Sequence, residues 1–233
     1  MSNKEEQKKR KEQLQQAARR KEKIQGLLIK TVIAVMIPLT AFVFFQGMFR
    51  SATVLPPDVV GEGDHVRGNE SADLVITVYA DFQCPSCLDE MEIVARAWPR
   101  IEDKVQYVFR YFPLDTHRHS FASARYAEAA GRQDKFWQMH DILFVNQALW
   151  SNVSDASVIF DGYAVQLGLD LEQLALDLDE QSLADKIIAN QQGGIRAGVR
   201  GTPAMFFNGE LMPTPKTSGE LISMIDMALA STE

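Results

Sequence analysis

The sequence predicts a mixed α/β domain that carries an inserted helical segment and follows one hydrophobic span. Three observations predict this architecture: an uncharged stretch over residues 31–49, a strand–helix–strand pattern within residues 74–111, and a hairpin and helix pattern after residue 198. A chain of 233 residues fits one domain, or one domain with an insertion.

Charge is distributed unevenly along the chain. Residues 1–30 contain ten Lys or Arg and four Glu, about +6, although the net charge of the whole chain is −7. The remainder is therefore acidic, which argues against nucleic acid as a partner of the body of the protein. The basic segment alone could contact nucleic acid or anionic lipid, or be a solvated tail, and these alternatives stay open.

The uncharged stretch is long enough for a membrane helix. At about 1.5 Å per residue, residues 31–49 span nearly the ~30 Å core of a bilayer, and residues 26–29 extend the apolar run. Pro38 is tolerated better in lipid than in a soluble helix. A cleaved signal peptide and a buried soluble helix are the alternatives, but the basic start is long and no Ala-x-Ala site follows.

We therefore expect a basic cytoplasmic tail over residues 1–25 and a transmembrane anchor over residues 26–49. Basic residues are concentrated before the span, so the positive-inside rule places residues 51–233 outside the cytoplasm. The expected location is the cell (inner) membrane, crossed once, with the catalytic domain in a compartment that permits disulfides.

The first part of the α/β domain follows a linker. Residues 50–69 are expected to be that linker, because Pro and Gly recur in it. The apolar run Leu74–Tyr79 is typical of a strand buried on both faces. A helix is expected from Leu88 to Trp98, ended by Pro99, and a second strand from Val105 to Tyr111. This order favours a parallel strand pair.

The second half is helical before strand signals return. Residues 114–197 show apolar residues at three- and four-residue spacing, which predicts an inserted helical subdomain. Asn208-Gly209 is a strong hairpin turn signal, and Thr217 with Glu220 fits a capping box before a final helix. The α/β domain is therefore expected in two parts, residues 70–113 and 198–233.

The two cysteines, Cys84 and Cys87, follow the first predicted strand and open the first predicted helix. A helix N-terminus favours negative charge, so the pKa of Cys84 should lie below its ordinary ~8.5. Cys87 lies one turn further in and should be less exposed. Pro85 suits the first helical turn, where its missing N–H costs nothing.

This pattern predicts thiol–disulfide exchange. A substrate thiolate attacks oxidised Cys84, and a second substrate thiol resolves the mixed disulfide; in the reducing direction Cys84 attacks and Cys87 resolves. A purely structural disulfide is the alternative, but so short a loop stabilises little. The cysteine pair would carry the electrons, so we expect no organic cofactor. Ligands for zinc are too few, so we also expect no metal.

A second motif, Gly201-Thr202-Pro203, precedes the last predicted strand pair. A proline that enters a strand after Gly-Thr can adopt a cis peptide bond, and an ordinary trans turn proline is the alternative.

These segments resemble the DsbA-like oxidoreductases of the thioredoxin superfamily. The resemblance covers about residues 58–231 and is carried by four segments: Asp81–Cys87, Phe112–Leu114 with His117, Lys135–Asp141, and Gly198–Pro203 with Asn208-Gly209. It implies a thioredoxin-like fold in which the helical subdomain is inserted.

The resemblance also implies roles for the site residues. Cys84 is the implied nucleophile, Cys87 its partner, and Pro203 a cis-proline packed against the disulfide. Thr202 would offer backbone hydrogen bonds to a substrate chain as a short added strand. The remaining substrate-binding candidates are the two residues between the cysteines, Pro85 and Ser86.

Two departures from the family pattern matter. Many members carry a buried acid in the first strand that assists proton transfer, where this chain has Val78. Asp81 is the substitute proton-relay candidate, with a strand-end structural role as its alternative. Ser86 replaces the His of strongly oxidising relatives, so we expect a milder oxidant.

Three histidines of the helical subdomain are not expected to be catalytic. His140 falls on an apolar stripe and should be a core histidine, whereas His117 and His119 should be surface or capping groups.

The expected function is disulfide formation in exported proteins by a monomeric enzyme, reoxidised by a quinone-linked membrane partner. A reductase or isomerase that uses the same cysteines is the first alternative. A membrane-tethered chaperone-like binding module is the second.

Overall fold

The computed structural model describes residues 53–231 and the isolated helical positions 34, 36–38 and 40. The chain divides into two compact units, Met1–Ser51 and Ala52–Glu233. The predicted tail and most of the predicted anchor lie outside the described residues. Among the residues that are described, no helix combines the length and apolar character needed to cross a membrane.

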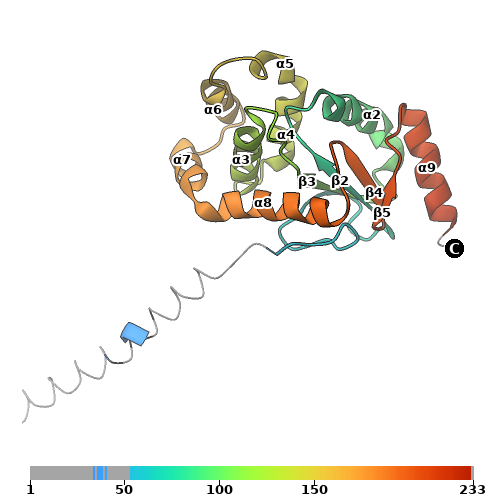
Figure 1. Ribbon diagram of the computed structural model, residues 1–233, viewed down its shortest axis with the longest axis horizontal. Helices are drawn as coiled ribbons and strands as arrows, with labels where there is room; N and C mark the ends of the chain where they lie inside the picture. The colour runs from blue at the N-terminus through green and yellow to red at the C-terminus, as the bar shows by residue number, and fades with distance from the viewer. Residues whose placement is uncertain (1–33, 35, 39, 41–52, 232–233) are drawn as a thin grey trace, which may run out of the picture. The chain divides into compact units, whose positions relative to one another are not determined.

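A mixed β-sheet forms the centre of the second unit (Figure 1). The strand order is β1-β3-β2-β4-β5. The pair β2 and β3 is parallel, which confirms the prediction, and the other neighbouring pairs are antiparallel. The strands are β1 His65–Gly68, β2 Leu74–Ala80, β3 Val105–Tyr111, β4 Ala204–Phe207 and β5 Glu210–Met212.

Within residues 53–231, the helices divide into one that follows the cysteine motif, a group inserted between β3 and β4, and one after β5. The first is α2 Pro85–Ile101, and the last is α9 Ser218–Ala230. The inserted group confirms the predicted helical insertion and comprises α3 Ser120–Gly131, α4 Phe136–Val145, α5 Gln147–Trp150, α6 Ser157–Gln166, α7 Leu171–Asp179 and α8 Gln181–Arg196.

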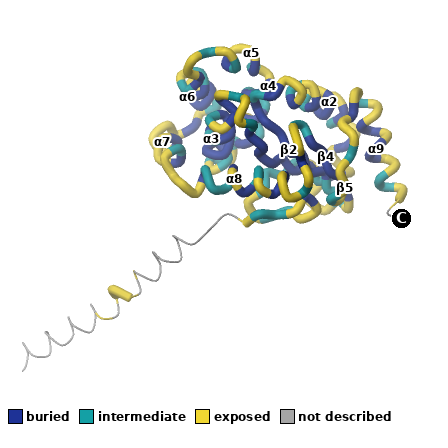
Figure 2. Tube along the Cα trace, in the orientation of Figure 1, coloured by how far each residue is buried: buried dark blue, intermediate teal, exposed yellow. Residues whose placement is uncertain are grey.

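Strand β2 is buried on both faces, as its apolar run predicts (Figure 2). Ile76 and Val78 belong to the main core, which also contains apolar residues of α2 and α9. Tyr79 belongs to a second cluster on the other side, with Phe112 and Phe206. There α8 approaches closely: a Cβ on Gly194 would lie 2.8 Å from the Phe112 ring.

Strand β1 lies within the segment predicted to be a linker, so that prediction is wrong for residues 65–68. The strand pairs antiparallel with β3, and its polar side chains pack against aromatic rings. The His65 ring stacks on Phe136 with centroids 3.5 Å apart. The Arg67 guanidinium lies 4.5 Å from the ring centroids of both Trp98 and Trp137. Hydrophobic patterning does not reveal such polar–aromatic packing.

Helix α2 continues through Pro99, which was predicted to end it. A proline near the end of a helix removes a single hydrogen bond, and Ala97 and Ile101 are fully buried around it. The burial of these apolar side chains therefore outweighs the lost hydrogen bond. The hairpin prediction is confirmed: Asn208 and Gly209 adopt φ angles of 46° and 85° between β4 and β5.

Candidate active site

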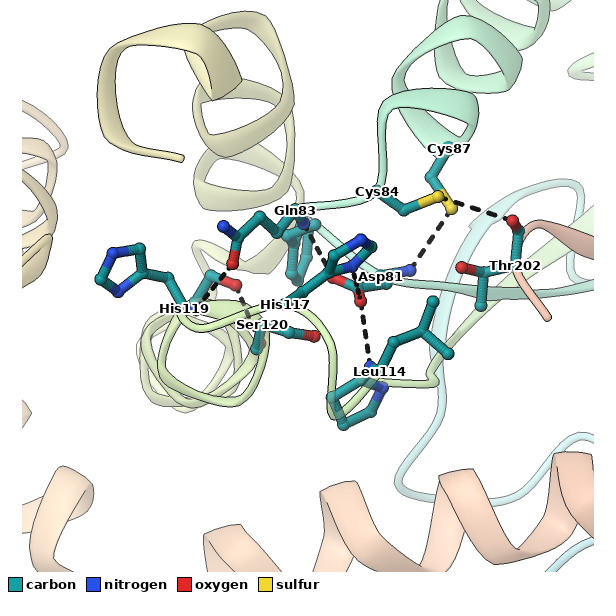
Figure 3. A network of polar contacts seen from close by, with 12 residues as sticks. Asp81, Gln83, Cys84, Cys87, Leu114, His117, His119, Ser120 and Thr202 are labelled. Atoms are coloured by element: carbon teal, nitrogen blue, oxygen red, sulfur yellow. Dashed lines mark hydrogen bonds and ion pairs between the residues drawn. The ribbon is translucent and has the colours of Figure 1, made fainter. Parts of the chain in front are cut away.

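Cys84 and Cys87 lie at the N-terminus of α2, where β2 has just ended (Figure 3). Cys84 is the N-cap residue, and the proline of the motif follows it in the first turn. Both cysteines are free thiols. Cys84 is 7% exposed and Cys87 is 1% exposed, so Cys84 is the more accessible sulfur.

The pKa values of the two thiols are shifted in opposite directions. A hydrogen bond from the Cys87 thiol is the largest cause that lowers the pKa of Cys84 to about 5, and backbone N–H groups of the first helical turn add to it against burial. Burial is the largest cause that raises the pKa of Cys87, which also gives the hydrogen bond to Cys84. At neutral pH the pair therefore holds one reactive thiolate and one thiol.

The loop before β4 meets the cysteine pair. The Thr202–Pro203 peptide bond is cis, which confirms the prediction. The carbonyl oxygen of Thr202 lies 3.5 Å from Cys84 Sγ, which donates to it in the thiol form. Antiparallel pairing of β4 with β2, beginning at Ala204 and Tyr79, holds this loop beside the motif.

A groove of about 670 Å³ borders the motif. Ser86, Thr202 and Pro203 line the end of the groove nearest the cysteines. Pro85 and Ser86 are exposed. Two of the predicted substrate-binding residues, Ser86 and Thr202, therefore line one groove, and Pro85 is exposed directly after Cys84.

Asp81 ties the motif to the segment that follows β3. Its buried carboxylate accepts hydrogen bonds from Gln83 N at 2.8 Å, Leu114 N at 3.0 Å and His117 Nδ1 at 2.7 Å. Its own backbone N–H donates to Cys87 Sγ at 3.5 Å. These donors come from the motif and from the segment after β3 and hold the carboxylate between them, so this geometry favours the structural alternative for Asp81 over the proton relay.

The predictions for the histidines have different outcomes. His119 is the N-cap residue of α3, as the capping prediction has it, but its buried ring donates to the Val153 carbonyl oxygen and not to the helix. The prediction of a surface or capping group is wrong for His117, whose partly buried ring binds the buried carboxylate of Asp81. His140 is a core histidine, as predicted: it is 1% exposed, and burial lowers its pKa to about 4.

Sequence reasoning missed Gln147. This buried side chain of α5 donates its amide to the carbonyl oxygens of Phe82 at 2.8 Å and Cys84 at 2.9 Å. Its partners are backbone atoms more than sixty residues away in the sequence, so no local pattern predicts the contact. The one signal was a polar amide directly before the apolar run Ala148–Trp150.

It also missed Glu90, which is 3% exposed on α2 and borders the groove. Within the described residues, no group of three or more His, Cys, Asp or Glu side chains is arranged to hold a metal ion.

An activated cysteine at a helix N-terminus, beside a cis-proline loop that leads into the neighbouring strand, is the arrangement of a thiol–disulfide oxidoreductase of the thioredoxin type. Residues 61–227 match the family model described as thioredoxin, and the chain belongs to this family.

Solved structures agree with this class. A thioredoxin-like oxidoreductase from Silicibacter pomeroyi is 25% identical, with a TM-score of 0.62, over 73% of this chain and 94% of that chain. Oxidised BdbD from Bacillus subtilis shares the fold with a TM-score of 0.64 at 20% identity, over 78% of this chain and 100% of that chain.

Among curated relatives, the Na(+)/H(+) antiporter NhaA 1 of Salinispora arenicola is 34% identical over 79% of this chain. The match covers 29% of the antiporter, so the chain spans less than a third of that relative's length.

Proposed function

We propose that the protein forms disulfides in exported proteins, with Cys84 as the nucleophile and Cys87 as its partner. The observation that carries this proposal is the place of Cys84 at the N-terminus of α2, where the Cys87 hydrogen bond and backbone N–H groups lower the pKa of Cys84 to about 5. A stabilised thiolate stabilises the reduced protein, which makes the disulfide form a better oxidant. The value lies between those of thioredoxin, about 7, and DsbA, about 3.5, which suits the milder oxidant expected from Ser86.

The reaction begins with the oxidised pair. A substrate thiolate attacks Cys84 Sγ, a new sulfur–sulfur bond forms, and the Cys84–Cys87 bond breaks with its electron pair on Cys87. A second substrate thiolate then attacks the substrate sulfur of the mixed disulfide, and Cys84 leaves as a thiolate. The substrate has lost two electrons, and the cysteine pair has gained them. No metal or organic cofactor is needed for these steps.

The substrate chain would lie along the groove beside the motif. The backbone of Thr202 would pair with it as a short added strand, and the exposed residues Pro85 and Ser86 would border its side chains. The 3.5 Å contact between Thr202 O and Cys84 Sγ supports this placement, because a chain bound there passes the reactive sulfur.

We further propose that the catalytic domain acts outside the cytoplasm, anchored by residues 26–49. The uncharged stretch after a basic segment supports this location, and the naming of the matched curated relatives as antiporters accords with work at a membrane. Reoxidation would then fall to a quinone-linked membrane partner, and the enzyme would act as a monomer.

The direction of exchange is tested with the oxidised full-length protein and reduced, unfolded ribonuclease. We expect the wild type to form disulfides in the ribonuclease, the Cys84→Ser variant to form none, and equilibration with glutathione to give a potential above the about −270 mV of thioredoxin. A potential at or below that value without oxidase activity would favour the reductase or isomerase alternative. A Cys84→Ser variant that keeps the cellular role would favour the chaperone-like alternative.

The location is tested separately by adding protease to intact spheroplasts. We expect residues 51–233 to be digested, and their protection would overturn the proposed orientation.

A further inference from the structure

Asp81 and Glu90 are buried carboxyl groups near the cysteine pair that differ in one respect. The Asp81 carboxylate accepts three hydrogen bonds. Glu90 is 3% exposed, and within the described part of the chain its Oε1 atom has no hydrogen-bond partner. Buried polar atoms are nearly always paired, so an unpaired carboxyl oxygen beside a reactive centre points to a chemical role.

The position of Glu90 connects the buried thiol with the groove. It follows Cys87 by three residues on α2, so both side chains lie on one helix face, one turn apart. Glu90 also lines the groove together with Ser86 and Thr202. Glu90 therefore shares a helix face with the buried cysteine and also borders the groove.

The exchange reaction needs a proton carrier at this place. Cys87 is 1% exposed, and burial raises its pKa, so a bare Cys87 thiolate is unfavourable. That sulfur must receive a proton each time the disulfide opens and lose one each time Cys87 attacks.

We propose that Glu90 is the positioning residue that relays protons to and from Cys87 through one water of the groove. This inference rests on the proposed exchange at Cys84 and Cys87. When a substrate thiolate opens the disulfide, protonated Glu90 passes its proton through the water to Cys87 Sγ and is reprotonated from solvent. In the opposite direction the carboxylate takes the Cys87 proton, Cys87 Sγ attacks Cys84 of the mixed disulfide, and the substrate leaves as a thiolate.

The electrostatics of the site favour Glu90 as the base. In the reduced enzyme burial is the largest cause that raises the pKa of Glu90 to about 8, and the nearby Cys84 charge is the second. In the Cys84–Cys87 disulfide and in a mixed disulfide Cys84 is uncharged, so of these two causes burial alone remains. The carboxylate therefore forms more readily in the mixed disulfide, at the step where Cys87 needs a base, while burial still raises the pKa of Glu90 for the step in which the disulfide opens.

Other ionisable groups lie near Glu90. Burial is the largest cause that raises the pKa of Tyr107 on β3, the Glu90 charge adds to it, and Arg67 of β1 opposes it. The charged residues that share its groove are Asp89, Glu92, Arg96 and Lys216. Glu102 is exposed at the C-terminal end of α2 and does not line this groove, which makes it a matched control beside the same helix.

The test follows the resolution step by stopped flow. The full-length protein carrying glutathione on Cys84 is mixed into buffers from pH 5 to 9, and glutathione release is recorded for wild type, Glu90→Gln, Glu90→Met and Glu102→Gln. We expect both Glu90 variants to release glutathione about 10- to 100-fold more slowly than wild type at pH 7. The ionisation step of the wild-type profile should disappear in them and persist in Glu102→Gln.

The controls separate this relay from structure and from the proposed function. Alkylation of reduced Cys84 should keep its wild-type pH midpoint in Glu90→Gln. The Met side chain of Glu90→Met has a volume similar to that of Glu and lacks the unpaired oxygen. If Glu90→Gln folds poorly, the rates of Glu90→Met therefore test the relay. Wild-type rates and profiles in a folded Glu90 variant, or a uniform slowing at every pH, would overturn the relay. Absence of exchange in the wild type would instead overturn the proposed function.

Discussion

The side-chain amide of Gln147 donates to the carbonyl oxygen of Cys84 at 2.9 Å, which joins the helical insertion to the reactive end of the motif. The same nitrogen donates to the Phe82 carbonyl oxygen at 2.8 Å. The insertion therefore holds the backbone on both sides of Gln83, where the chain passes from β2 into α2. The helical insertion therefore contributes directly to the structure of the active site.

Replacing Gln147 with Leu should lower the free energy of unfolding by about 2 kcal/mol, because two buried carbonyl groups lose their donor. Urea denaturation measures this change. Gln138→Leu is the control, since Gln138 is exposed on the neighbouring helix α4, and it should change stability by less than about 0.5 kcal/mol. Equal stability of the two variants would mean that the Gln147 contacts contribute nothing.

Alkylation of the reduced protein by iodoacetamide should follow the ionisation of Cys84. We expect a rate that rises with a midpoint near pH 5, because the Cys87 hydrogen bond lowers the pKa of Cys84 to about 5. Cys87→Ala removes that donor and should move the midpoint upward. A wild-type midpoint near the ordinary value of about 8.5 would show that the thiolate is not stabilised.

The lowered pKa also makes the stability of the reduced protein depend on pH. Between the folded pKa of Cys84, about 5, and its ordinary pKa of about 8.5, the unfolded chain binds the proton that the folded chain has released. The free energy of unfolding of the reduced form should therefore rise relative to the oxidised form as pH increases through this range. Urea denaturation of both forms from pH 5 to 9 tests the sign, which an opposite trend would contradict.

His140 should make the folded protein less stable in acid. Burial lowers its pKa from 6.5 to about 4, so in this window the unfolded chain binds a proton that the folded chain excludes. The associated stability is complete above pH 6.5 and falls by about 3 kcal/mol on acidification to pH 4. His140→Phe should show a smaller decrease across this range in chemical denaturation, and an unchanged slope would rule out His140 as its source.

Gly194 should be intolerant of a side chain. An added Cβ would lie 2.8 Å from the Phe112 ring and 2.9 Å from the Tyr79 ring, so Gly194→Ala should cost about 1 to 3 kcal/mol. Gly162 lies inside helix α6 with open space around its Cβ position. Gly162→Ala should therefore stabilise the protein by about 0.5 to 1 kcal/mol. Thermal unfolding of the pair tests the close approach of α8 to the sheet, and shifts of the same sign would contradict it.

Much of the fold was predictable because local signals agreed with it. The apolar run Leu74–Tyr79 predicted a strand buried on both faces. Asn208 and Gly209 are residue types that readily adopt the positive φ angles of the hairpin turn. The cysteine motif and the Gly201-Thr202-Pro203 segment could be paired across the fold only through the family resemblance. Their 3.5 Å contact joins residues 118 positions apart.

The features that were missed depend on contacts that leave no local pattern. Strand β1 is stabilised by aromatic rings from other elements around His65 and Arg67. The role of Gln147 arises from backbone carbonyls at the far side of the fold. Glu90 lies in a helix whose other acidic residues are exposed, and only its burial distinguishes it.

The central claim, that Cys84 forms the covalent bond to substrate, is tested most directly by trapping. Cys87→Ala and Cys84→Ala variants are incubated with a peptide disulfide, and the adducts are located by mass spectrometry after alkylation. We predict a stable peptide adduct on Cys84 in the Cys87→Ala variant and none on Cys87 in the Cys84→Ala variant. Adducts formed equally on both sulfurs, or only on Cys87, would contradict the account.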